Sequence, residues 1–102
     1  MSEIQQLKSE IRAFADARNW EVFHTPKNLS MAIAGEAGEL VAEFQWLTMQ
    51  ESMRENLSEK QLQDVKMEIA DVAIYLLRLT DVLGVDFADA IREKMKINES
   101  RF

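Results

Sequence analysis

The sequence predicts an all-α fold, a four-helix unit that forms a single domain over residues 1–102. Apolar residues recur three and four positions apart along most of the chain, which is typical of amphipathic helices. No stretch alternates between apolar and polar residues as a half-buried strand would. The one proline, Pro26, and the glycine at position 84 stand where a helix is predicted to begin and to end.

The first helix is predicted over residues 3–18, where apolar side chains recur at helical spacing: Ile4, Leu7, Ile11, Phe14 and Ala15. A linker over residues 20–24 follows it. Thr25 is the predicted N-cap of the second helix and Pro26 its first residue, a position where the missing N–H of proline costs nothing. We expect this helix to continue to about Trp46 or Thr48.

Ser58 and Gln61 form a capping-box pattern that predicts the start of the third helix. This helix is expected to run to about Leu83, because Gly84 is placed to end it. Asp86 can cap a fourth helix, which we expect to fray near residue 98. Four helices joined by connections of this length indicate a bundle-like unit.

Composition and charge narrow the classes of function. The net charge of −6 argues against a nucleic-acid partner, which would need a basic stripe. It does not argue against a single phosphate-bearing ligand, since a divalent cation can reverse the local charge. The chain has no cysteine, and so no disulfide or thiolate metal site. Without a secretory leader or a membrane-length apolar run, we expect a cytoplasmic protein with no membrane partner.

Apolar residues make up 47% of the chain, which is high for 102 residues. A domain of this size buries only about 60–65% of its unfolded surface. The excess predicts apolar faces that a monomer cannot cover, and hence a homo-oligomer, either a dimer or a tetramer.

Two carboxylate pairs stand on the two central helices: Glu36 with Glu39, and Glu68 with Asp71. Residues three apart lie on one face of a helix, so each pair can bind one object together. The helices around them are apolar nearly all round, which is typical of buried helices. None of the four acids has a basic residue four positions further on to compensate its charge.

Buried carboxylates without partners must become protonated or bind a cation. Four converging carboxylates offer only oxygen ligands, which favour Mg²⁺, with Mn²⁺ as a substitute. Two alternatives stay open at this stage. The first is a non-catalytic helical oligomer that binds a nucleotide or a partner and uses the acids only for solubility or register. A di-iron carboxylate protein is a lesser alternative, because its Glu-x-x-His motif is absent.

The segment from Gly35 to Leu40, followed by Glu68-Ile-Ala-Asp71, resembles the Glu-x-x-Glu … Glu-x-x-Asp signature of the MazG-like nucleoside-triphosphate pyrophosphohydrolases. The resemblance is strongest to the dCTP pyrophosphatase branch and extends over most of the chain. Its further motifs are Phe14-Ala15, Arg18-Asn-Trp20, Phe23-His24, Pro26-Lys-Asn28, Phe44-Gln-Trp46, Asp71-Val-Ala-Ile-Tyr75 and Lys94-Met-Lys-Ile-Asn98. Two positions depart from this branch: Asn19 replaces a frequent Asp, and Phe102 replaces a common Tyr.

The resemblance implies a Mg²⁺-dependent enzyme that hydrolyses a nucleoside triphosphate between the α- and β-phosphates. The substrate it implies is dCTP or a related pyrimidine deoxynucleotide, and the role is house-cleaning of the nucleotide pool. It also implies that the four-helix unit forms dimers, and usually a tetramer, with sites shared between subunits.

Residue roles follow from the resemblance. The metal ligands would be Glu36, Glu39, Glu68 and Asp71, and Glu39 would also act as the general base. Eight further residues would bind the substrate. Those expected at the phosphates are Lys27, Lys94, Asn98 and Arg101; those expected at the nucleoside are Trp20, His24, Trp46 and Tyr75.

Overall fold

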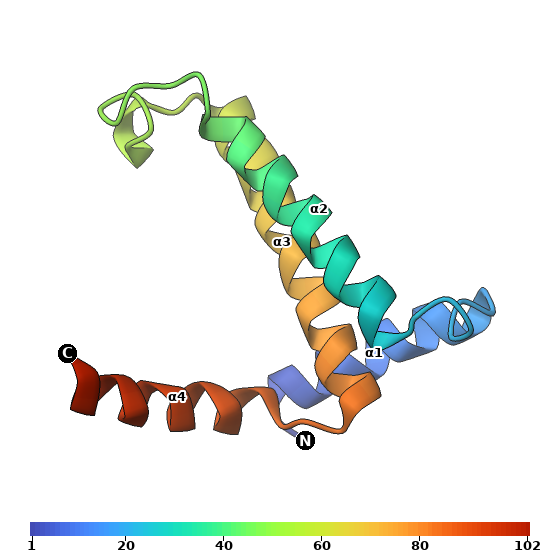
Figure 1. Cartoon of the computed structure of the whole chain (residues 1–102). Coiled ribbons are helices and arrows are strands. Elements are labelled where there is room, and N and C mark those ends of the chain that lie inside the picture. The colour runs from blue at the N-terminus through green and yellow to red at the C-terminus, as the bar shows by residue number, and fades with distance from the viewer.

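The computed structural model describes all residues from 1 to 102 and confirms the all-α prediction (Figure 1). Its four helices are α1 (Glu3–Ala17), α2 (Pro26–Phe44), α3 (Glu59–Leu83) and α4 (Phe87–Arg101). A short 3₁₀ turn, η1 (Arg54–Asn56), lies in the connection between α2 and α3. None of the helices combines the length and the apolar character needed to cross a lipid bilayer.

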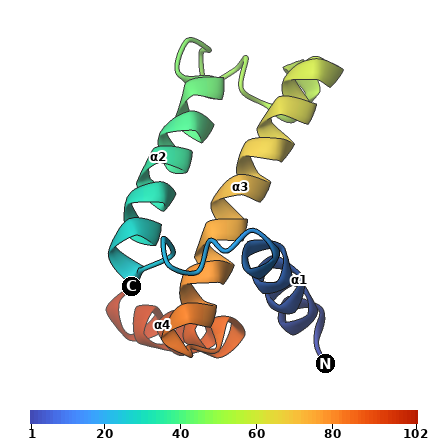
Figure 2. The same cartoon turned by 90° about the vertical axis from the view of Figure 1, so that its right-hand side faces the viewer.

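The long helices α2 and α3 form an antiparallel hairpin, which is the body of the chain (Figure 1). Helix α1 packs across the C-terminal half of α3, at the end of the hairpin where α2 begins (Figures 1 and 2). Helix α4 leaves the end of α3 and runs off to one side, packing along none of the other helices (Figure 1). The unit is therefore an open arrangement rather than a closed bundle.

The predicted helix caps are confirmed. The Thr25 hydroxyl accepts a hydrogen bond from the Asn28 N–H at 3.2 Å, which fixes the start of α2. Ser58 and Gln61 form both bonds of a capping box at the start of α3. Gly84 has a φ of 68°, the left-handed conformation that ends α3 and that side chains disfavour.

Two predicted helix ends differ from the structure. Helix α2 ends at Phe44, so Trp46 lies in the turn that follows. A local bond pair explains this end, because the Thr48 N–H donates to the Glu51 carboxylate and the Glu51 N–H donates to the Thr48 hydroxyl. Helix α4 continues to Arg101 instead of fraying near residue 98.

The expectation that α2 and α3 are buried on nearly every side is wrong for the single chain. Only Leu29 of α2 is fully buried, whereas Val41 is 61% exposed and Ile69 of α3 is 53% exposed. Two helices in a hairpin can cover only one face of each other. The radius of gyration is correspondingly large, 16.1 Å, against about 13 Å for a compact chain of 100 residues.

Candidate active site

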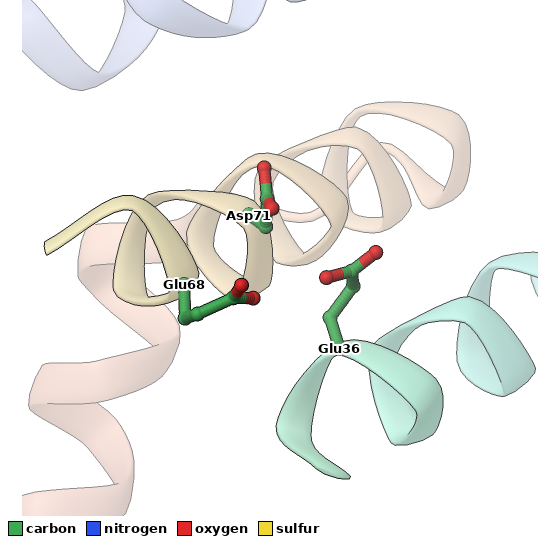
Figure 3. A group of neighbouring side chains, drawn as sticks. All are labelled: Glu36, Glu68 and Asp71. Atoms are coloured by element: carbon green, nitrogen blue, oxygen red, sulfur yellow. The ribbon is translucent and has the colours of Figure 1, made fainter. Parts of the chain in front are cut away.

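Three of the predicted acids meet across the hairpin. Glu36 projects from α2 toward Glu68 and Asp71 on α3 (Figure 3). One carboxylate oxygen from each residue lies within 4.8 Å of the other two, and all three residues are half-buried. The spacing of three along α3 puts both of its acids on the face that looks at α2. The structure thus brings together acids that are far apart in the sequence.

The fourth predicted acid, Glu39, is not in this group of three. It is exposed and stands one turn further along α2 than Glu36. Its charge nevertheless acts on the cluster, since it is one of the carboxylates that raise the pKa of Glu68. Glu39 is therefore a neighbour of the three converging acids.

Glu68 lies in surroundings that are unfavourable for a charged carboxylate. Its Oε2 atom is buried and has no hydrogen-bond partner. Burial raises the pKa of Glu68 above its ordinary value, and the charges of Asp71, Glu36, Glu39 and Glu43 raise it further. None of the chain's four ion pairs reaches the cluster.

These properties fit a hard divalent cation. The cluster offers only carboxylate oxygens, the ligands that Mg²⁺ and Mn²⁺ prefer. The unpartnered Oε2 of Glu68 lacks the donor that a buried oxygen normally finds, and a cation would satisfy it. Glu36, Glu68 and Asp71 are therefore suited to hold a metal ion.

A cavity of about 260 Å³ lies beside the acids, between α1, the α1–α2 linker and α3. Its walls are mostly apolar or aromatic, and they include three of the residues predicted to bind the nucleoside. The lining residues are Ile11, Phe14, Ala15, Trp20, His24, Asp71, Ile74, Tyr75 and Arg78. Asp71 belongs both to this wall and to the acid cluster, so the two sites adjoin.

The aromatic rings of this cavity are held against one another. Trp20 packs edge-on against Phe14 with ring centroids 5.7 Å apart. The ring of His24 follows at 6.1 Å from that of Trp20. Asn19 turns the chain between the end of α1 and the linker, with a φ of 57° that asparagine tolerates.

His24 is oriented by a buried arginine. The Nε–H of Arg78 donates to Nδ1 of His24 at 3.0 Å. Burial lowers the pKa of His24, and the positive charge of Arg78 lowers it further against a smaller opposing effect of Glu21. Both effects favour the neutral form of His24, which directly precedes the N-cap of α2.

The fourth residue predicted to bind the nucleoside, Trp46, does not line the cavity of its own chain. Trp46 is 87% exposed and follows the last residue of α2. That end of α2 lies roughly 12 Å along the helix axis from Glu36. Tyr75 lies beyond the acids toward the other end of the hairpin from Trp46, because α3 runs antiparallel to α2 (Figure 1).

The four residues expected at the phosphates are also apart from the acids. Lys27 is exposed at the start of α2. Lys94, Asn98 and Arg101 lie on α4, which projects away from the hairpin (Figure 1). These residues can reach an acid cluster only in another copy of the chain or after a rearrangement.

Sequence reasoning missed Arg78 as a member of this cavity. The signal was present, because Asp71, Tyr75 and Arg78 follow at i, i+4 and i+7 on one face of α3. These three are also the only polar residues between Ile69 and Leu79. A charged residue in such an apolar stretch indicates a buried partner.

Comparisons with known proteins identify the family of this chain. The sequence profile of the MazG-like family matches residues 31–102. The dCTP pyrophosphatase 1 of Homo sapiens is 39% identical over the whole chain, and that of Mus musculus is 37% identical. The chain spans 58% of the length of each of these two relatives.

A solved structure covers nearly the same length of chain. It is the crystal structure of a pyrophosphatase from Archaeoglobus fulgidus, which matches with a TM-score of 0.90 and 39% identity. The match covers 100% of this chain and 94% of that one. On its helices, its acid signature and these comparisons, the chain belongs to the MazG-like family.

Proposed function

We propose that this chain is a Mg²⁺-dependent nucleoside-triphosphate pyrophosphohydrolase. Its substrate is dCTP or a related pyrimidine deoxynucleoside triphosphate, and its products are the monophosphate and pyrophosphate. The observation that carries the proposal is the position of Asp71, which lies in the acid cluster and in the wall of the aromatic cavity. A ligand with a flat heterocycle at one end and phosphates at the other fits such a pair of sites. The role is house-cleaning of the nucleotide pool.

The acids provide the chemistry of the phosphate end. Glu36, Glu68 and Asp71 would hold Mg²⁺, with Glu39 as a further ligand. When bound, the ion would supply neutralisation of phosphate charge and a water that is easier to deprotonate. Glu39 is exposed beside the cluster, so a carboxylate oxygen of this residue can accept the proton of the attacking water. The water oxygen forms a bond to one of the two phosphorus atoms that the bridging oxygen joins. The bond from that phosphorus to the bridging oxygen breaks, and the bridging oxygen leaves with the other product.

The cavity binds the nucleoside part of the substrate. Trp20 and Tyr75 offer aromatic faces to the base, and stacking on such faces tolerates any flat heterocycle. His24 adds a polar group in the same wall. The dCTP pyrophosphatase 1 relatives support a pyrimidine as the base.

The active form is a homo-oligomer, a dimer or a dimer of dimers. The exposed surface of the chain is 7798 Å², against roughly 5,900 Å² for a compact monomer of this mass. The excess is larger than the roughly 800 Å² per partner of a standard interface. An apolar groove supports an interface on the hairpin; it is lined by Leu40, Val41, Phe44, Gln45, Val65 and Ile69.

Helix α4, which packs along no other helix of its own chain, supports active sites that are shared between subunits. Ile91, Met95 and Ile97 are all more than 40% exposed on this helix, which packs along no other. A second copy can cover these side chains, and Lys94, Asn98 and Arg101 would then meet the phosphates of the copy on which α4 rests. In the same way, Trp46 would contact a base that is bound by another copy of the chain.

The test is release of pyrophosphate from each common nucleoside triphosphate, with Mg²⁺ and with EDTA. We expect pyrophosphate from dCTP or a related pyrimidine deoxynucleotide, only with the metal. Glu39→Gln should abolish turnover while nucleotide binding persists, because a glutamine keeps the shape but accepts no proton. Release of single phosphates, or turnover unaffected by EDTA, would contradict the proposal.

A further inference from the structure

Arg78 is a buried charged residue that the proposed chemistry leaves without a role. It is only 6% exposed, yet it lines the aromatic cavity beside His24 and Tyr75. We infer that Arg78 is a positioning residue: it holds His24 as the tautomer protonated on Nε2, so that His24 donates a hydrogen bond to the nucleobase. The inference rests on the proposed function, because it names how that site recognises its base.

The hydrogen bond between the two side chains fixes the tautomer. A guanidinium carries only donors, so the ring nitrogen that faces the Nε–H of Arg78 must be an acceptor. That nitrogen is Nδ1 of His24, at 3.0 Å. A neutral imidazole has one proton, which must then lie on Nε2. Protonating Nδ1 as well would set two N–H groups against each other.

The arginine itself is held in place from the other side. Its Nη1 lies 3.3 Å from an Asp81 oxygen, and the side chains of these two residues are 7% and 13% exposed. Arg12 of α1 also binds Asp81, with its Nε 2.7 Å from the same oxygen. A buried charge needs such partners to be stable. The chain Arg12–Asp81–Arg78 thus ties α1 to α3 and points a fixed Nε–H at His24.

His24 lines the cavity, and one of its two ring nitrogens is free to bind a ligand. Nδ1 is used by Arg78, and no hydrogen bond within the chain uses Nε2. The cavity around it is walled mainly by aromatic and aliphatic groups, Trp20 and Tyr75 among them. A neutral donor in such surroundings suits a carbonyl oxygen or an unprotonated ring nitrogen of a base. A phosphate would instead favour a charged donor. The lowered pKa of His24 agrees with this neutral role.

A spectroscopic test needs no substrate, and His24 is the only histidine of the chain. Long-range ¹⁵N–¹H correlation spectra of the protein without nucleotide report which ring nitrogen carries the proton. We expect Nε2–H in the wild type, and a mixture of both tautomers in Arg78→Met. Arg78→Lys keeps a charge beside Asp81 but has no Nε–H, so it should show the same mixture. Arg12→Met, which touches Asp81 and not His24, should keep the wild-type tautomer.

The kinetic test asks whether Arg78 acts through His24. Arg78→Met should raise KM for the preferred nucleotide about three- to tenfold, the effect of one hydrogen bond, with kcat little changed. His24→Gln keeps an amide N–H near the place of Nε2. In that background Arg78→Met should change KM less than about twofold, since the bond to Nδ1 no longer exists.

Three outcomes would overturn the inference. These are a wild-type His24 protonated on Nδ1, a tautomer that Arg78→Met and Arg78→Lys leave unchanged, and equal effects of Arg78→Met on KM in both backgrounds. If the wild type hydrolyses no nucleotide, the proposed function fails instead, and base recognition by His24 fails with it. The spectra then still decide whether Arg78 sets the tautomer.

Discussion

Glu36 of α2 and Glu68 of α3 face each other across the hairpin, with carboxylate oxygens within 4.8 Å, and neither forms an ion pair (Figure 3). Like charges this close oppose folding unless a proton or a cation intervenes. Glu68 carries most of this conflict, because its Oε2 is buried without a partner.

Mg²⁺ should raise the melting temperature of the wild type. At a concentration of one hundred times its Kd, the ion adds about 2.7 kcal/mol to the free energy of unfolding. For a domain of this size that corresponds to a rise of roughly 10–20 °C. Glu68→Gln and Asp71→Asn should reduce the shift and also turnover. A wild type whose melting is unaffected by Mg²⁺ would show that the acids do not bind metal.

Without metal, Glu68 should make the protein less stable as the pH rises. Its pKa in the folded state lies above the ordinary 4.5, so the folded state binds a proton that the unfolded state has released. Stability is therefore lost as the pH rises from about 4.5 through the folded pKa. His24 acts oppositely, since its lowered pKa makes the protein gain stability as the pH rises toward 6.5.

The two effects can be separated with one variant. Urea midpoints of the wild type and of Glu68→Gln, measured in EDTA between pH 4.5 and 7, should diverge as the pH rises. The variant should become the more stable protein at neutral pH, because glutamine carries no charge to repel Asp71 or Glu36. Parallel curves for both proteins would contradict the raised pKa of Glu68.

Asp81→Asn should destabilise the fold by about 3 kcal/mol, because it leaves the buried guanidinium of Arg78 without a charged partner. Chemical denaturation measures this loss. Lys60→Met is the matched control: it breaks the Lys60–Asp64 ion pair, in which Lys60 is 86% exposed, and it should lower stability much less, because an ion pair exposed to solvent contributes little. Equal losses in the two variants would show that burial of the Asp81 pair is unimportant.

Light scattering at micromolar concentration should give a mass well above 11.8 kDa. Val41→Glu, at a residue 61% exposed in the single chain, should lower that mass, because it places a charge in the apolar groove of the hairpin. Val22→Glu, at a residue 68% exposed on the α1–α2 linker, should leave the mass unchanged. A monomeric wild type would remove the basis for shared sites.

Trp46→Ala should lower kcat/KM roughly 5- to 150-fold through the loss of stacking. Trp20→Ala should have an effect of similar size, since Trp20 lines the cavity in its own chain. Stabilisation by Mg²⁺ should survive in both variants, because neither residue is a metal ligand. If Trp46→Ala keeps its rate and its nucleotide preference but loses the oligomer, Trp46 is a structural residue.

The helices and the acid pairs follow from local patterns in the sequence. Helix spacing and caps depend on residues only three or four positions apart, which is why Thr25, Ser58 and Gly84 could be recognised as boundaries. The i, i+3 spacing likewise placed Glu68 and Asp71 on one face of α3. The end of α2 is predicted too late, at Trp46 or Thr48 instead of Phe44, because the competing bonds of Thr48 and Glu51 lie outside the apolar repeat.

Which of these residues come into contact depends on how the helices pack. The pairing of α2 with α3 brings Glu36 to Glu68 and Asp71 but leaves Glu39 exposed one turn away. The packing of α1 on α3 makes the cavity and joins Arg78 to His24, a contact between residues 54 positions apart. Such contacts depend on how apolar faces cover one another in space, and local spacing carries no information on that choice.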